Sequence, residues 1–320
     1  MKELEYLKII NETLTDNSLL GDDCAFLSPD TLGKDGLFVT QDSLVENVHF
    51  DLKTISPFEL GKKAMSVNIS DLAAMCAKPL FVTVGLSLPK DISGDFVKEL
   101  YRGINDVAQK YDVKVIGGDI TASMNIFISI CAIGKKQASV SVSRKFAKVD
   151  DVVVTTGVHG DSAGGLKVLQ LDLSNNENLV RSHIAPEPDI ECSKILAKTA
   201  TQNFAMMDTS DGLCDALFKI AKESNVSINV DFSSIPISRD LKKTFPDEYK
   251  QLVFWGGEDY KLLFCINKQD FEKLPKDKFF KIGEVVPMSL EPIVKITDLN
   301  KNYIIDEAVI NNKSFNHFGD

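Results

Sequence analysis

The sequence has few of the features that would assign the protein to a membrane, to nucleic acid or to a zinc site. No stretch approaches the roughly 18 uninterrupted apolar residues that a membrane-spanning helix needs. There is no run of basic residues, and the net charge of −10 opposes binding to a nucleic-acid backbone. The four histidines share no ligand spacing, and the six cysteines include no C-x-x-C pair. We therefore expect no nucleic-acid or membrane partner, no zinc, and reduced, mostly buried thiols in a cytoplasmic protein.

Common phosphate-handling motifs are missing as well. The sequence contains no G-x-x-x-x-G-K-[ST] P-loop and no G-x-G-x-x-G dinucleotide motif. It also has neither the His-Arg-Asp nor the Asp-Phe-Gly motif of protein kinases. If the protein handles phosphate, a different architecture does so.

The chain of 320 residues, 44% apolar and 26% charged, is long enough for two domains of ordinary globular composition. Apolar spacing predicts strands at 37–41, 81–88, 113–116 and 126–133 and helices at 56–76 and 95–111 in the first half. In the second half it predicts strands at 152–156, 226–230, 260–266, 279–282 and 293–296 and helices at 162–171, 189–201 and 211–224. A polar, basic stretch at 135–150 separates the halves. We predict an α/β fold with domains 1–148 and 149–320.

Six short segments each place aspartate beside glycine or a hydroxyl residue at the edge of an apolar run. They are Gly21-Asp22-Asp23-Cys24-Ala25, Thr40-Gln41-Asp42-Ser43, Asn68-Ile69-Ser70-Asp71-Leu72, Gly117-Gly118-Asp119, Gly160-Asp161-Ser162-Ala163-Gly164-Gly165 and Asp208-Thr209-Ser210-Asp211-Gly212. Carboxylates in apolar surroundings are costly unless they are paired or bound to a cation. If the segments converge, hard oxygen ligands without a Cys/His cluster favour Mg²⁺, which binds phosphates readily. The pattern therefore points to nucleotide chemistry.

Each segment also has a local explanation. Asp71 fits a narrow polar helix stripe that faces solvent, and Asp119 fits a glycine turn after a strand. Asp208 and Asp211 flank a turn in which a side chain could cap the following helix. The glycine-rich turn 157–166 fits either a tight strand-to-helix connection or an anion site at a helix N-terminus. Six such segments together favour the shared site.

The order of the motifs resembles the thiamine-monophosphate kinase family. The matching motifs are Gly-Asp-Asp-Cys-Ala, Gln-Asp-Ser-Leu-Val-Glu-Asn-Val-His-Phe, Lys-Ala-Met-Ser-Val-Asn-Ile-Ser-Asp-Leu-Ala-Ala-Met, Ile-Gly-Gly-Asp, Gly-Asp-Ser-Ala-Gly-Gly-Leu, Asp-Thr-Ser-Asp-Gly-Leu and Gly-Gly-Glu-Asp-Tyr. They extend from about Gly21 through essentially the whole chain. The resemblance implies the two-domain fold of the aminoimidazole ribonucleotide synthetase superfamily. It also implies a homodimer whose N-terminal sheets pair into a barrel, with ATP near the subunit interface.

The resemblance also implies the site residues. Magnesium ligands fall on Asp23, Thr40, Asp42, Asp71, Asp119, Asp208 and Asp211; nucleotide contacts fall on Gly118, Asp119, Arg144 and Ser210; thiamine-phosphate contacts fall on His49, Glu258 and Phe315. Three positions depart from the family pattern: Gln41 replaces a small hydroxyl residue, Phe315 replaces Tyr or Trp, and Asp189 replaces an arginine.

The implied reaction is phosphorylation of thiamine monophosphate to thiamine diphosphate with ATP and several Mg²⁺ ions. The acceptor phosphate is already anionic, so in-line transfer needs no catalytic base, and we assign no catalytic residue. Two relatives are alternatives. Selenophosphate synthetase carries a reactive Cys or selenocysteine in a glycine-rich N-terminal segment, and the first 20 residues here contain neither Cys nor Gly. The hydrogenase maturation protein ends in cysteine, whereas this chain ends in Asp320. A non-catalytic nucleotide or thiamine-phosphate sensor is the third alternative.

Overall fold

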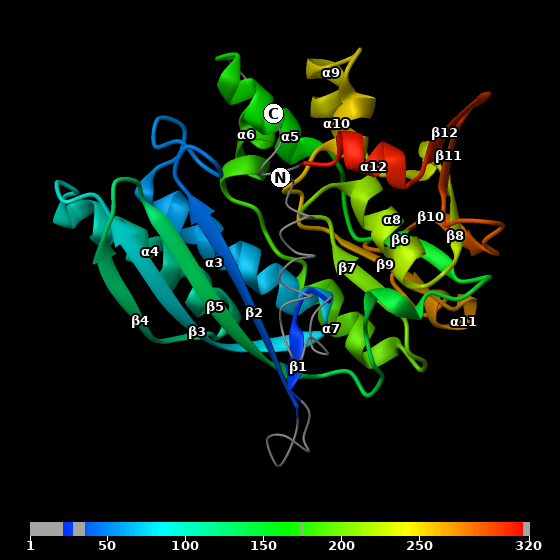
Figure 1. Ribbon diagram of the computed structural model, residues 1–320, viewed down its shortest axis with the longest axis horizontal. Coiled ribbons are helices and arrows are strands. Elements are labelled where there is room, and N and C mark those ends of the chain that lie inside the picture. Colours follow the sequence, from blue (N-terminus) through cyan, green and yellow to red (C-terminus); the bar gives the residue numbers. More distant parts are fainter. Residues whose placement is uncertain (1–21, 28–35, 174–175, 316–320) are drawn as a thin grey trace.

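The computed structural model describes residues 22–27, 36–173 and 176–315. Within these ranges the strands form two sheets, one of five strands from the first half of the chain and one of seven from the second half. Figure 1 shows the two sheets on opposite sides of the molecule, with helices packed between and around them. Gly21, part of the first acidic segment, lies outside the described residues.

The five-stranded sheet has the order β1-β2-β5-β3-β4 and is covered on one face by two long helices. Its strands are β1 (Ala25–Leu27), β2 (Leu37–Val45), β3 (Ala77–Leu88), β4 (Lys114–Ala122) and β5 (Phe127–Lys136); the helices are α3 (Pro57–Ala74) and α4 (Gly94–Tyr111). Helix α3 packs on β2, β3 and β5, and α4 packs on α3. Ser56 and Glu59 form a reciprocal capping box at the start of α3, where Pro57 fits the first turn.

The seven-stranded sheet has the order β12-β11-β8-β10-β6-β9-β7, and its paired strands are antiparallel except for β11 and β8. Its strands are β6 (Val152–Thr155), β7 (Ala205–Asp208), β8 (Ser227–Asp231), β9 (Leu262–Ile266), β10 (Phe280–Val286), β11 (Val294–Asp298) and β12 (Lys301–Ile305). The helices of this half are α5 (Asp161–Gln170), α6 (Glu177–Ile184), α7 (Ile190–Thr199), α8 (Leu213–Glu223), α9 (Arg239–Thr244), α10 (Tyr249–Trp255), α11 (Lys268–Phe271) and α12 (Glu307–Lys313).

Two apolar cores hold the halves together. One lies between α3, the five-stranded sheet and one face of the seven-stranded sheet, and includes Leu60, Leu196 and Phe264. The other lies on the opposite face of the seven-stranded sheet, under α8 and α10, and includes Leu217 and Leu263. Since the first core crosses from one half into the other, residues from both halves hold fixed positions at their junction.

The predicted long elements are confirmed, but the glycine turn at 117–119 is wrong. Strand β4 runs without a break from Lys114 to Ala122 and pairs in parallel with β3. Gly118 has a φ of +157°, and a Cβ there would lie 2.0 Å from the carbonyl oxygen of Val84. The glycine therefore permits a close backbone approach inside a strand and does not mark a turn.

Two further sequence expectations concern the membrane and the cysteines. Among the described residues, no helix combines the length and the apolar character needed to cross a membrane. All six cysteines are free thiols; five are buried and Cys131 is half-buried.

We predict that the contact between α3 and α4 is sensitive to one added methyl group. A Cβ on Gly103 would lie 1.9 Å from the carbonyl oxygen of Phe58, so Gly103→Ala forces the helices apart. The expected loss is about 1–3 kcal/mol of unfolding free energy in urea denaturation. Gly94→Ala, also in α4, is the control because nothing lies within 4 Å of its Cβ. Equal stability of the two variants would contradict this account of the packing.

Candidate functional site

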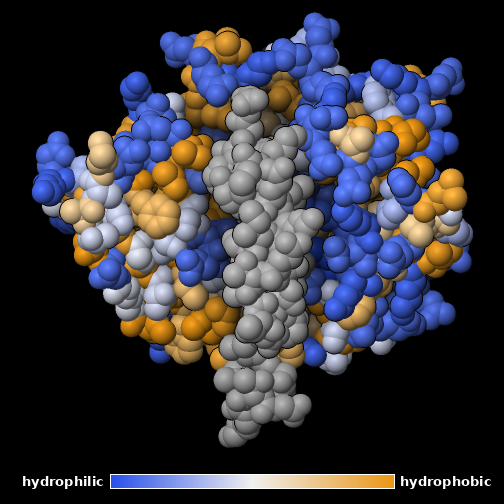
Figure 2. All heavy atoms as spheres, in the orientation of Figure 1, coloured by the Kyte–Doolittle hydropathy of each residue, from blue (hydrophilic) through white to orange (hydrophobic). Residues whose placement is uncertain are grey.

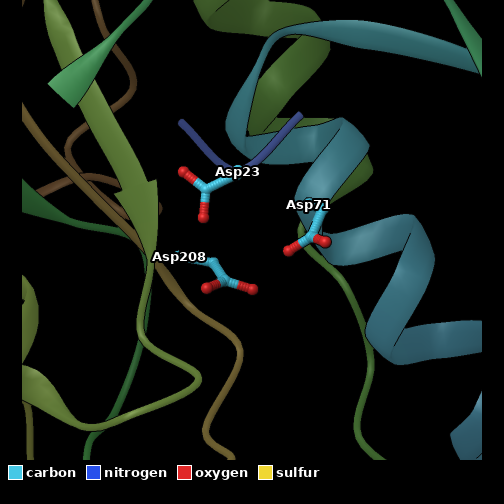
Figure 3. A group of neighbouring side chains, drawn as sticks. All are labelled: Asp23, Asp71 and Asp208. Atoms are coloured by element: carbon cyan, nitrogen blue, oxygen red, sulfur yellow. The ribbon is translucent and has the colours of Figure 1, made fainter. Parts of the chain in front are cut away.

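Three aspartates from distant parts of the chain converge where the two halves meet. Asp23 precedes β1, Asp71 lies on α3 and Asp208 ends β7. One carboxylate oxygen of each lies within 4.8 Å of the others, and Figure 3 shows the three side chains close together. Three of the six acidic segments therefore converge, and Asp71 does not lie on a solvent-facing helix stripe.

Burial of like charges dominates the electrostatics of this cluster. Burial raises the pKa of Asp71, and the charges of Asp42 and Asp208 raise it further. Burial and the charge of Asp23 raise the pKa of Asp208 to about 7. Burial is also the main reason why the pKa of Asp42 rises to about 6, followed by the charges of Asp211 and Asp23. The folded protein thus holds carboxylates that are costly to ionise without a cation.

Hydroxyl groups fix the orientation of these carboxylates. Thr40 Oγ1 donates a 2.6 Å hydrogen bond to Asp71 Oδ2, and Ser70 Oγ donates one of 2.6 Å to Asp208 Oδ2. Ser210 Oγ donates a bond of 2.9 Å to Asp208 Oδ1. Because Ser70 belongs to α3 and Asp208 to β7, one of these bonds joins the two halves of the chain at the site.

One basic side chain contacts the cluster, and a second contacts acidic residues beside it. Arg144 contacts Asp23 Oδ1 at 3.1 Å, and Lys219 on α8 contacts Asp211 at 2.8 Å and Asp215 at 2.7 Å. The Arg144 side chain is 21% exposed, so a nucleotide can reach it in the folded protein, as its predicted role requires. These contacts leave Asp71 and Asp208 without a direct basic partner among the described residues.

The cluster fits a divalent cation. Within the described part of the chain, Asp23 Oδ2 is buried without a hydrogen-bond partner, although a carboxylate oxygen is a strong acceptor. The converging donors are all carboxylate oxygens, with no nitrogen or sulfur among them. Such a donor set suits Mg²⁺ or Mn²⁺ and is unsuited to a tetrahedral zinc site.

Asp119 and Gly118 are not part of this cluster within one chain. Register places Asp42 on β2, Ile130 on β5, Val84 on β3 and Gly118 on β4 in one row across the sheet. Three strand spacings separate the two ends of that row, about 14 Å. Asp119 lies one residue further along β4, which is exposed over its whole length.

The glycine-rich turn 157–166 is a tight strand-to-helix connection and not an anion site, because a carboxylate of the chain itself occupies the N-terminus of α5. The Asp259 carboxylate accepts hydrogen bonds from the backbone N–H groups of Gly160 at 2.6 Å and Ser162 at 3.0 Å. Asp259 is buried, and burial raises its pKa to about 7. The glycine-rich turn is therefore a tight connection closed by an internal carboxylate, and it leaves no room for a phosphate there.

Ser162 also lies in a G-x-S-x-G sequence, but its surroundings exclude a nucleophile. Its Oγ lies 3.3 Å from His183 Nδ1, and Glu258 Oε2 lies 3.3 Å from the same nitrogen. A hydrolytic triad needs the serine and the acid on opposite ring nitrogens. Ser162 is also fully buried in the first turn of α5.

The three residues predicted to contact thiamine phosphate lie apart from one another in sequence and differ in setting. His49 Nδ1 accepts a 3.0 Å hydrogen bond from the backbone N–H of Val45. Glu258 is 26% exposed and forms an ion pair with Lys63. Phe315 follows α12 and is 59% exposed.

Lys63, Ser70 and Lys219 contact residues of the site, but none of the three was expected there from the sequence. Lys63 interrupts the apolar run of the predicted helix 56–76, which could have marked it as a buried charge with a partner. Lys219 follows Asp215 by four residues, the spacing of an ion pair on one helix face. Asp189, which replaces the family arginine, accepts a hydrogen bond from Thr156 Oγ1.

We predict that Asp208→Asn stabilises the cation-free protein in alkaline solution. The pKa of Asp208 rises from 3.8 unfolded to about 7 folded, so its ionisation destabilises the fold as pH rises between these values. In EDTA, the variant should melt at a higher temperature than the wild type at about pH 8, and the difference should shrink toward about pH 5. Mg²⁺ should stabilise the wild type more than the variant in scanning calorimetry. A variant less stable than the wild type at both pH values in EDTA would contradict this reading.

Comparisons with known proteins agree with the fold and the motifs. Residues 21–135 match the model of the AIR synthase related protein N-terminal domain, and residues 148–293 match that of the C-terminal domain. The thiamine-monophosphate kinase of Bacillus subtilis (strain 168) is 32% identical over 315 residues, which cover 93% of each chain.

Solved structures lead to the same family. A structure named AaThiL complexed with AMPPCP and TMP is 30% identical, covers 95% of this chain and 96% of its own, and has a TM-score of 0.83. The thiamine monophosphate kinase of Aquifex aeolicus is 30% identical, covers 91% of this chain and 95% of its own, and has a TM-score of 0.80. The sequence, the fold and these relatives agree: this chain belongs to the thiamine-monophosphate kinase family.

Proposed function

We propose that the protein transfers the γ-phosphoryl group of ATP to thiamine monophosphate, giving thiamine diphosphate and ADP. The observation that carries the proposal is the convergence of Asp23, Asp71 and Asp208 in a chain of this family. A relative of nearly equal length and the same fold binds AMPPCP and TMP together, as its name states. Both ligands are anionic, so a protein of net charge −10 needs bound cations to hold them side by side.

The cations that we propose are Mg²⁺ ions, held by Asp23, Asp42, Asp71 and Asp208 of one chain. Bound Mg²⁺ would neutralise the charge on the two phosphates and orient them for in-line attack. Thr40 and Ser70 hold two of these carboxylates in place through their hydroxyl groups. Lys219 already contacts Asp211, so a role for Asp211 as a ligand requires this lysine to turn toward Asp215 alone.

The chain's own residues supply binding and orientation rather than a proton acceptor. Arg144 and Ser210 lie beside the carboxylates, where we propose that they contact the nucleotide phosphates. The attacking oxygen belongs to a phosphate that is ionised at neutral pH. Rate enhancement therefore comes from holding two anions in contact and excluding water.

We further propose that the active protein is a homodimer in which β4 meets a second copy. All nine residues of β4 are exposed, and Val115, Ile116 and Ile120 are 40%, 55% and 63% exposed. Figure 2 shows hydrophobic residues on the surface over the five-stranded sheet. A long apolar edge strand is an aggregation hazard unless another chain covers it.

The position of Asp119 supports the same assembly. Pairing places Asp119 in a row with Gly85, Ser129 and Ser43, and not in the row of Asp42. A second copy can bring Gly118 and Asp119 to the first copy's carboxylates, which one chain cannot do across three strand spacings. The barrel of paired N-terminal sheets belongs to this proposal.

Two coarser proposals complete the assignment. We propose a domain boundary at 148/149, because η1 (Arg144–Phe146) and the following turn connect the two sheets. We also propose a cytoplasmic location, since ATP is the phosphoryl donor.

The proposed reaction predicts a specific acceptor requirement. Purified protein with ATP and Mg²⁺ should release ADP in a coupled assay when thiamine monophosphate is present and far more slowly when it is absent. Thiamine offers a neutral hydroxyl that needs a base, so it should be a very poor acceptor. AMP as the product, or equal rates with thiamine, would reject the assignment; ligand binding without turnover would indicate a sensor.

The proposed dimer predicts that two inactive variants complement each other. Asp42→Asn and Asp119→Asn should each reduce turnover by orders of magnitude. Unfolding the two variants together in equal amounts and refolding them should restore about a quarter of the wild-type activity, since half of the dimers then contain one intact site. Refolding each variant alone is the control. No recovery in the mixture, with dimers confirmed by light scattering, would place both residues in the same chain's site.

A further inference from the structure

Lys63 is a buried lysine whose one acidic partner, among the residues that the structure describes, lies on the far side of the junction between the halves. Its side chain is 1% exposed, in the middle of α3. The ammonium group contacts both carboxylate oxygens of Glu258, at 2.9 Å to Oε1 and 3.1 Å to Oε2. A charge buried to this degree is costly unless it is paired. The ion pair must therefore form whenever α3 packs in its native position.

The backbone around Glu258 is held as tightly as its side chain. Glu258 has a φ of +64°, a left-handed conformation that residues other than glycine rarely adopt. Its N–H donates a 2.7 Å hydrogen bond to the carbonyl oxygen of Ser210. A Cβ on the preceding Gly257 would lie 2.6 Å from the same oxygen. A strained backbone kept by several contacts is typical of a functional position.

Glu258 lies beside the carboxylate cluster and keeps one side open. Its N–H bonds to the carbonyl oxygen of Ser210, and the Ser210 hydroxyl in turn donates a 2.9 Å hydrogen bond to Asp208 Oδ1. The Glu258 side chain is 26% exposed, whereas Lys63 is enclosed. Lys63 and His183 contact the carboxylate on its buried side, and the rest of the carboxylate is open to solvent.

His183 does not replace Lys63 as the counter-charge. Its Nδ1 lies 3.3 Å from Glu258 Oε2 and 3.3 Å from Ser162 Oγ. Burial, followed by the charge of Lys63, lowers the pKa of His183 to about 4, although the charge of Glu258 opposes this shift. The ring is neutral at neutral pH, so it contributes a hydrogen bond and Lys63 contributes the positive charge.

We propose that Lys63 is a positioning residue, which fixes the Glu258 carboxylate in the orientation that contacts thiamine monophosphate. The inference deepens the proposed function and rests on it, because the family resemblance makes Glu258 a contact of the thiamine monophosphate that the proposed reaction phosphorylates. Lys63 does not touch the substrate. It acts from the inner side of Glu258 and couples the position of α3 to the substrate-facing segment 256–260.

A double-mutant cycle distinguishes this role from one in which the Lys63–Glu258 ion pair only stabilises the fold. The variants are Lys63→Met, Glu258→Gln and the double variant, with Lys63→Arg as the conservative change. Lys62→Met is the matched control, because Lys62 is the adjacent residue of α3 and pairs with Asp106 at 3.2 Å on the surface. KM for thiamine monophosphate and KM for ATP are measured for each, together with thermal unfolding.

We expect Lys63→Met to raise KM for thiamine monophosphate by at least about tenfold and KM for ATP by less than about twofold. The double variant should match Glu258→Gln alone, since Lys63 acts only through that carboxylate. Lys63→Arg, which keeps the charge, should recover part of the loss, and Lys62→Met should resemble the wild type. The double variant should also be more stable than either single variant. Each single variant leaves one charge of the pair without its partner, whereas the double variant leaves none.

Three results would overturn the positioning role. They are equal changes in the two KM values, additive effects in the double variant, and loss of stability in Lys63→Met with unchanged KM in the folded fraction. Failure of the proposed function gives a different result, in which the wild type itself neither binds thiamine monophosphate in calorimetry nor phosphorylates it. That outcome removes the substrate contact and the positioning role with it.

Discussion

Repulsion among buried carboxylates is the constraint on which the arrangement of this protein depends. Asp23, Asp71 and Asp208 place oxygens within 4.8 Å of one another at the junction of two sheets. In a low-dielectric setting these charges destabilise the folded chain unless protons or cations neutralise them. The apolar core that crosses the junction offsets that cost and holds the carboxylates together. A binding site for cations, and through them for phosphates, is therefore built at the expense of stability.

The site draws on both halves because neither half carries the whole set of ligands. Asp71 and Thr40 come from the first half, Asp208 and Ser210 from the second, and the Ser70–Asp208 hydrogen bond joins them. The Lys63–Glu258 pair forms a second polar link across the same junction. Any motion that separates the sheets would break both links together, so the halves act as one body at the site.

Much of the fold follows from patterns visible in the sequence. The short elements and the contacts between residues far apart in the sequence do not. Helix α3 was predictable because Ser56, Pro57 and Glu59 cap a strongly apolar run. The sequence predicts a strand that ends at residue 116, because Gly117 and Gly118 are usually turn residues. Their role inside β4 depends on the approach of β3. The carboxylates were recognisable as a set, but the pairing of Lys63 with Glu258 spans 195 positions and depends on tertiary packing. The same holds for Asp259. Its carboxylate accepts a backbone hydrogen bond at the N-terminus of α5, and no local sequence pattern reveals this contact.

The central claim is that the buried carboxylates bind divalent cations in the folded protein. The most direct measurement is anomalous X-ray scattering from crystals of the protein with Mn²⁺ and a non-hydrolysable ATP analogue. The account predicts an anomalous peak about 2.1–2.3 Å from carboxylate oxygens of Asp23, Asp71 or Asp208, bridging to phosphate oxygens of the nucleotide. Nucleotide bound in the crystal with no anomalous peak among these three residues would contradict it.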